Sequence, residues 1–140
     1  MKKDDRKRLS DAYPFLWTYE MATMPDGWTE IVERLLADLD AIQPQPERVF
    51  GRLINLVVRS GGGFAIVYAS VNDLAEWDAE KALKLVEAIQ RFNNSTSRSC
   101  QVCGDPSVMI VKETDGSKQE MLCQRHADAR LAEYDRGTMQ

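Results

Sequence analysis

The sequence is poor in histidine and cysteine and has no long apolar run. It contains one histidine and three cysteines among 140 residues. No apolar segment approaches the ~18 residues of a membrane-spanning helix, and the first ten residues, MKKDDRKRLS, lack the apolar core of a secretory signal. An odd number of cysteines does not form a closed disulfide framework. We therefore expect a cytoplasmic protein whose clustered cysteines bind a metal.

Basic charge is scarce beyond the N-terminus. Residues 1–10 carry five Lys or Arg and two Asp or Glu, whereas residues 11–90 carry six and thirteen. The formal net charge of the whole chain is −4. Proteins that bind a phosphate backbone usually have a basic surplus, because their affinity comes largely from counterion release. The acidic body therefore favours a protein partner, and residues 1–10 are expected to be a disordered charged tail.

Hydrophobic spacing predicts that residues 11–93 form an α+β core. From Trp28 to Ile42 the apolar side chains recur with the 3.6-residue period of a helix, which must end before the prolines that follow. The stretches Arg52–Ser60 and Phe64–Ser70 are rich in β-branched and aromatic residues. They therefore predict two strands of a hairpin.

The segments around this hairpin have no signature of a ligand-binding loop. Gly61–Gly63 join the strands, but a phosphate-binding loop needs a following Lys-Ser/Thr and a helix N-terminus, and both are absent. A second helix is expected over residues 73–92, and the polar stretch 93–99 is expected to be a linker. The aromatic-rich segment Tyr13–Trp28 is expected to cover the core, with an exposed contact patch as the alternative.

All three cysteines and the only histidine lie in two short motifs. Cys100 and Cys103 form a Cys-x-x-Cys pair, and Cys123 and His126 form a Cys-x-x-His pair. A two-residue gap lets both thiolates of the first pair reach one tetrahedral ion. Three thiolates and one imidazole close a tetrahedral shell. We therefore expect one structural zinc ion per chain, bound by Cys100, Cys103, Cys123 and His126.

The stretch between the two pairs predicts a hairpin. Asp115-Gly116 is flanked by β-prone residues, and a two-residue turn there places Ile110 opposite Met121. A helix is expected to begin after Cys123, with its first turn supplying the second ligand pair. A Cys-x-x-Cys turn, a hairpin and a helix in this order resemble a treble-clef zinc finger. Residues 94–140 are therefore expected to form the zinc-binding module.

Three other uses of these residues agree less well with the sequence. A redox Cys-x-x-Cys would leave the second ligand pair unexplained. A catalytic zinc keeps one position open for water, whereas four protein ligands close the shell. A metal-dependent nuclease of the treble-clef type needs further histidines, and His126 is the only one. No Ser-His-Asp or Cys-His catalytic set can be assembled without removing a zinc ligand, so no enzymatic activity is expected.

Five short motifs follow one another along the chain. They are a YP-x-L segment, a DGW that opens a helix, a V-x-G-x-L stretch, a CxVCG and an LCxxH. In this sequence they occupy Tyr13–Leu16, Asp26–Trp28, Val49–Leu53, Cys100–Gly104 and Leu122–His126. This order resembles a family of small zinc-binding proteins encoded in phages and prophages. The resemblance implies a phage or prophage origin and a structural zinc, and it implies no activity.

The sequence thus predicts an α+β protein, in which an N-terminal helix–β-hairpin–helix unit carries a C-terminal treble-clef-like zinc module. We expect a non-enzymatic, protein-binding accessory protein of phage origin that inhibits or redirects a host component, including a bacterial defence complex. The alternative is a nucleic-acid-binding transcriptional regulator that uses the basic N-terminus and Arg125, Arg130 and Arg136. A hydrolase of unspecified chemistry is a third hypothesis.

Overall fold

The computed structural model describes residues 1–42, 54–61, 63–71, 78–106, 109–112 and 119–138. The expected α+β class is confirmed, with helices and two antiparallel two-stranded sheets. In chain order the elements are α1 (Lys3–Ala12), α2 (Tyr19–Ala22), a 3₁₀ turn η1 (Asp26–Trp28), α3 (Thr29–Ile42), β1 (Ile54–Gly61), β2 (Phe64–Val71), α4 (Ala79–Thr96), β3 (Met109–Lys112), β4 (Gln119–Leu122) and α5 (Gln124–Thr138).

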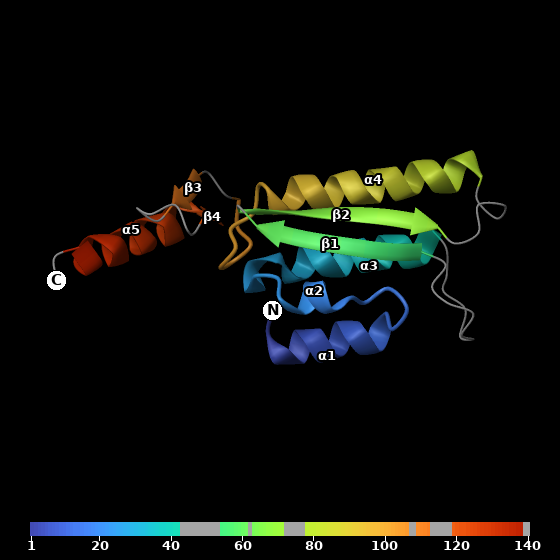
Figure 1. Cartoon of the computed structure of the whole chain (residues 1–140), viewed down its shortest axis with the longest axis horizontal. Helices are drawn as coiled ribbons and strands as arrows, with labels where there is room; N and C mark the ends of the chain where they lie inside the picture. The colour runs from blue at the N-terminus through green and yellow to red at the C-terminus, as the bar shows by residue number, and fades with distance from the viewer. Residues whose placement is uncertain (43–53, 62, 72–77, 107–108, 113–118, 139–140) are drawn as a thin grey trace.

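The elements form a layered body with a smaller unit at one end (Figure 1). Helix α4 packs against both β2 and α3, and α1 lies at the outer edge of the body. Strands β3 and β4 and helix α5 extend from one end of it. Each part has its own buried apolar cluster. The larger cluster belongs to α1 through α4, and the smaller one consists of Cys100, Val111, Leu122, Cys123 and Ala127.

Helix α3 supplies the central apolar stripe. The expected 3.6-residue pattern is confirmed, because Val32, Leu35, Leu36 and Leu39 are all buried. The helix is described to Ile42, and the proline-containing stretch that follows lies outside the described residues.

The first hairpin pairs as expected, and its two faces differ in burial. Val57 pairs with Tyr68 and Val58 with Val67 in the antiparallel register. Because successive side chains of a strand point to opposite faces, Val58 and Val67 are buried whereas Val57 and Tyr68 are exposed. Of the three expected turn glycines, Gly62 lies outside the described residues, and Gly63 adopts a positive φ of 89°.

The second hairpin confirms the expected register. Strands β3 and β4 are antiparallel, and Ile110 is the partner of Met121. The Asp115-Gly116 turn from which this register was inferred lies outside the described residues.

The expected disordered tail at residues 1–10 is wrong. Lys3–Ala12 form helix α1, and Leu9 is completely buried in the main core. The Arg8 guanidinium binds the Glu33 carboxylate of α3, with an Nη1–Oε1 distance of 2.6 Å. One apolar side chain and an ion pair to a distant helix give this short helix its tertiary support. Neither contact produces a hydrophobic period within the segment.

The expected linker at residues 93–99 is also wrong over its first half. Helix α4 continues to Thr96, so the expected domain boundary at residue 93 falls inside the helix. The Asn93 side-chain oxygen accepts a hydrogen bond from the Val67 N–H at 3.1 Å. The Thr96 hydroxyl accepts one from the Ala65 N–H at 3.1 Å. The side chains of Asn93 and Thr96 therefore bind backbone N–H groups of β2 along the edge that does not pair with β1.

We predict that Thr96→Val destabilises the protein although it preserves side-chain shape. Thr96 is fully buried, so valine would leave the Ala65 N–H without its acceptor. The expected loss in the free energy of unfolding is about 1–3 kcal/mol, to be measured by urea denaturation. Thr23→Val is the control, because the Thr23 hydroxyl donates to a carbonyl at an exposed site. Equal stabilities of the two variants would contradict the role of Thr96.

The aromatic-rich segment belongs mostly to the core. Leu16 and Trp28 are buried, and Tyr13 and Trp17 pack against the core cluster. Tyr19 is the exception and is 80% exposed. The segment is therefore chiefly structural, in agreement with the favoured interpretation of the sequence.

Candidate metal centre

The structure brings the four expected ligand residues together. Cys100 and Cys103 lie in the turn before β3, Cys123 lies between β4 and α5, and His126 is in the first turn of α5. The three Sγ atoms and one imidazole nitrogen all lie within 4.8 Å of one another. Among the described residues, no other group of three or more such side chains is this compact.

Three of the six distances between the candidate ligand atoms are close to those of a tetrahedral site. The Sγ atoms of Cys103 and Cys123 are 3.8 Å apart. The His126 Nδ1 atom lies 3.2 Å from the Cys123 sulfur and 3.5 Å from the Cys100 sulfur. A tetrahedron with metal–sulfur bonds of ~2.3 Å has sulfur–sulfur edges of about 3.8 Å and sulfur–nitrogen edges of about 3.6 Å. The residues present therefore fit a four-coordinate metal centre of the Cys₃His type.

The backbone around the first pair forms a tight turn. The Gly104 N–H donates to the Cys100 carbonyl at 2.9 Å, and the Cys100 N–H donates to the Asp105 carbonyl at 2.8 Å. Gly104 has a φ of +81°, the left-handed region that glycine enters without steric penalty. The turn thus holds both sulfurs of the pair on the side of the second ligand pair.

The sulfurs of this pair differ in acidity. Burial raises the pKa of Cys100, but hydrogen bonds from the backbone N–H groups of Cys123, Cys103 and Val102, together with the Cys103 thiol, lower it to about 6. The Asp105 N–H lowers the pKa of Cys103, but desolvation, hydrogen bonds to Cys100 and Cys123 and the charge of Cys100 raise it to about 11. Between pH about 6 and 11 and without a cation, Cys100 is therefore a thiolate and Cys103 a thiol.

We predict that metal affinity increases with pH over the neutral range. Between pH about 6 and 11, the metal-free site holds a proton on Cys103 that a cation must displace, so affinity should increase at least about tenfold per pH unit. Below pH about 6 the proton on Cys100 must also leave, and the dependence should steepen. Competition between the protein and a chromophoric chelator for added zinc measures this slope. A pH-independent affinity would contradict the prediction, because it would show that metal binding displaces no proton from Cys103.

The Cys100–Gly104 turn, which carries the first pair of candidate ligands, is docked onto the N-terminus of helix α3. The Gly27 N–H donates to the Gln101 carbonyl at 2.9 Å, and the Trp28 indole N–H donates to the Ser99 carbonyl at 3.1 Å. Gly27 and Gly104 also touch through their backbones. The DGW and CxVCG motifs therefore form one contact, although about seventy residues separate them. The sequence contains both motifs, but spacing alone does not reveal that they meet.

Gln101 links the same turn to the second hairpin. Its backbone N–H donates to the Met121 carbonyl at 2.9 Å, and its side-chain oxygen accepts from the Met121 N–H at 2.6 Å. This pairing places the turn beside the end of β4, from which the chain enters α5. One backbone and one side-chain hydrogen bond therefore position the two cysteine-containing segments against each other, independently of any bound metal.

The turn, hairpin and helix follow one another in the order expected for a treble clef, and the arrangement is compatible with that fold. Among the described residues, no helix has both the length and the apolar character that crossing a membrane requires. No protein-family model matches the chain, and neither a curated protein nor a solved structure matches it.

Proposed function

We propose that the four-residue cluster holds one zinc ion and that the C-terminal unit is a treble-clef zinc finger. Three sulfurs and an imidazole nitrogen are the donor set that zinc prefers in structural sites. Four protein ligands leave no position for a substrate or a catalytic water. The role of the ion is then to hold the β3–β4 hairpin and α5 together, because the apolar cluster there is small.

We further propose that the protein is a non-enzymatic accessory protein that binds another protein. The observation that carries this proposal is the outer face of the β1–β2 hairpin. Tyr68 is 59% exposed, Val57 50% and Phe64 43%. Val57 and Tyr68 are cross-strand partners, so their side chains lie side by side. Neighbouring exposed aromatic and aliphatic side chains are typical of protein interaction surfaces.

The resemblance to small phage and prophage zinc proteins supports a more specific form of this proposal. A phage-encoded protein without catalytic residues acts on its host by occupying a surface of a host component. We therefore propose an inhibitor or modulator of a host protein, including a bacterial defence complex, that works in the reducing cytoplasm where zinc thiolates persist.

The nucleic-acid alternative receives less support from the charged contacts. Arg130 binds Glu120 at 2.8 Å and Glu133 at 2.9 Å. In α1, Arg8 binds Glu33, and Lys7 binds Asp11. These carboxylates offset several of the cations that would otherwise contact phosphates.

Affinity capture from nuclease-treated bacterial lysate tests the proposed function. The wild-type protein should retain a specific protein, and a double variant Val57→Ser, Tyr68→Ser should lose it while keeping its thermal stability. Leu83→Ser is the matched control, because the Leu83 side chain is as exposed as that of Tyr68 but lies on α4. Recovery of nucleic acid without protein, or equal capture by all three proteins, would contradict the proposal.

A further inference from the structure

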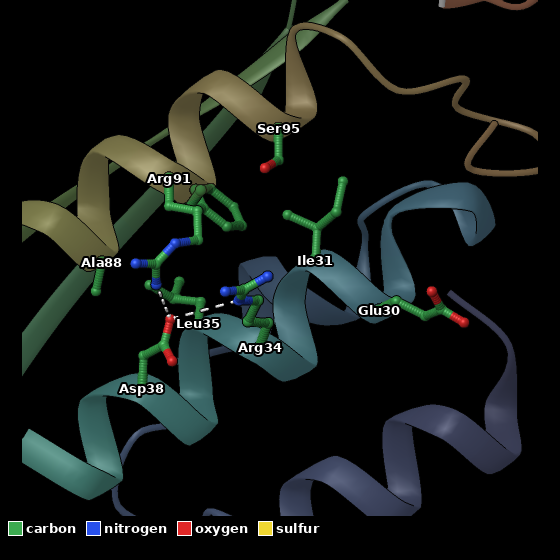
Figure 2. Close-up of a pocket in the computed structure, with 9 residues that line it drawn as sticks. Glu30, Ile31, Arg34, Leu35, Asp38, Ala88, Arg91 and Ser95 are labelled. Carbon is green, nitrogen blue, oxygen red and sulfur yellow. Dashed lines mark hydrogen bonds and ion pairs between the residues drawn. The ribbon is translucent and has the colours of Figure 1, made fainter. Parts of the chain in front are cut away.

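Helices α3 and α4 enclose a hollow that the metal centre and the hairpin face do not use (Figure 2). Its volume is about 200 Å³. The apolar lining consists of Leu35, Ala88 and Phe92, which are buried, together with the half-buried Ile31. The hollow therefore offers an apolar surface large enough for a single branched or aromatic side chain.

Two arginines meet at one carboxylate in the mouth of this hollow (Figure 2). Arg91 Nη1 lies 2.6 Å from Asp38 Oδ2. Arg34 Nε lies 3.9 Å from the same oxygen, so this second pair is loose. Glu30 also lines the hollow, but its carboxylate points away from the arginines (Figure 2). Within the described part of the chain, two guanidinium groups at the mouth thus share the one carboxylate of Asp38.

The groove continues beyond the Arg91–Asp38 ion pair. A second hollow of about 280 Å³ shares Asp38, Ala88 and Arg91 with the first. It is extended by Ala41, Ile42, Lys84 and Glu87. The ion pair therefore bridges a continuous groove between the two helices. A groove that runs between two helices and is crossed by an ion pair suits an extended chain better than one compact molecule.

We propose that this groove binds a short segment of a partner protein in which an apolar side chain is followed by an aspartate or glutamate. The apolar side chain enters the hollow between α3 and α4. The carboxylate binds the guanidinium N–H groups of Arg34 and Arg91 that Asp38 does not use, in charge-assisted hydrogen bonds. This site goes beyond the proposed function, because it names the chemistry of a second recognition surface whose residues are distinct from those of the hairpin face.

Peptide titration followed by NMR tests the proposal on the zinc-loaded full chain. The probe is the acetylated and amidated tetrapeptide Gly-Leu-Asp-Gly, and Gly-Leu-Asn-Gly is the neutral isostere. The aspartate peptide should shift the backbone amides of Leu35, Ala88 and Phe92 and the Arg34 Nε–H. The asparagine peptide should bind about tenfold more weakly, because it loses the charge-assisted hydrogen bonds. Equal binding of the two peptides, or shifts located elsewhere, would overturn the proposal.

Variants assign the effect to the mouth of the groove. Arg34→Gln should weaken the aspartate peptide about five- to tenfold and leave the asparagine peptide unchanged. The fold should tolerate it, because the Arg34 side chain is 67% exposed and only loosely paired. Arg6→Gln, an exposed arginine of α1, is the matched control and should bind like the wild type.

Two further probes test whether a different kind of ligand occupies the groove. Isovalerate carries the same branched apolar group and a carboxylate, but no peptide chain. If it binds as tightly as the aspartate peptide, the groove recognises a small organic acid and the proposed partner segment is wrong. Tighter binding of Gly-Leu-Lys-Gly would reverse the charge assignment and overturn the proposal. Because the lysate capture depends on Val57 and Tyr68, which do not line this groove, either proposal can fail without the other.

Discussion

The Cys103→Ser variant is expected to lose tight zinc binding and the folded structure of the β3–β4–α5 unit. Apparent binding free energies of structural zinc are ~10–16 kcal/mol at neutral pH, and binding is coupled to folding. The buried apolar cluster of this unit has five members, and two of them, Cys100 and Cys123, are themselves proposed ligands. Without the ion, the remaining burial is too small to order the unit.

Cys103 is the most informative of the proposed ligands to change because it is exposed. Replacing its sulfur by a hydroxyl removes little packing, so any loss of structure reports the lost ligand. Val102→Ser is the matched control in the same turn, since Val102 is exposed and contributes no ligand atom. Elemental analysis should find about one zinc per wild-type and Val102→Ser chain, and much less in Cys103→Ser.

The folded structure of α5 should be lost together with the bound zinc. In Cys103→Ser the NMR signals of α5 should collapse toward random-coil positions, whereas those of α3 should be retained. A Cys103→Ser protein that keeps both its zinc and its α5 signals would refute the assigned ligand set. A wild-type protein that folds fully without metal would refute the structural role of the ion.

The parts of the fold that the sequence predicts correctly depend on local patterns. Helix α3 is predicted correctly because the apolar residues of its buried face recur with the 3.6-residue period of a helix. The register of Ile110 with Met121 follows from a turn motif and the period of two in a strand. The grouping of the three cysteines and the histidine follows from their spacing, because a tetrahedral metal site would restrict the gap between its ligands.

The parts that the sequence does not reveal depend on partners far along the chain. Helix α1 has no apolar stripe, and its anchor Leu9 reaches a core formed by other elements. The stretch after residue 92 is polar, yet Asn93 and Thr96 are helical because their side chains bind backbone groups of β2. Polar composition alone predicts a loop, since it cannot show where a hydrogen-bonding side chain finds its partner.

Gly27 lies directly against the backbone of the Cys100–Gly104 turn and leaves no room for a side chain. A methyl group added at Gly27 would collide with the Cys100 carbonyl oxygen and lie 2.7 Å from both the Gln101 carbonyl carbon and the Gly104 nitrogen. All three atoms belong to the backbone, so no side chain can rotate away to relieve the overlap. Gly27→Ala is therefore expected to displace the turn and to destabilise the protein by about 3 kcal/mol.

The same displacement should weaken metal binding, although Gly27 supplies no ligand. Gly27 and Trp28 hold the backbone of Ser99 and Gln101, on either side of Cys100. Moving this backbone disturbs the tetrahedral placement of the Cys100 sulfur, so zinc affinity should fall together with stability. Gly61→Ala is the matched control, because an added methyl there meets no atom within 4 Å. Zinc competition and thermal unfolding of both variants measure the coupling. If Gly27→Ala loses stability but binds zinc like Gly61→Ala, the turn adjusts as a unit and the N-terminus of α3 does not position the metal ligands.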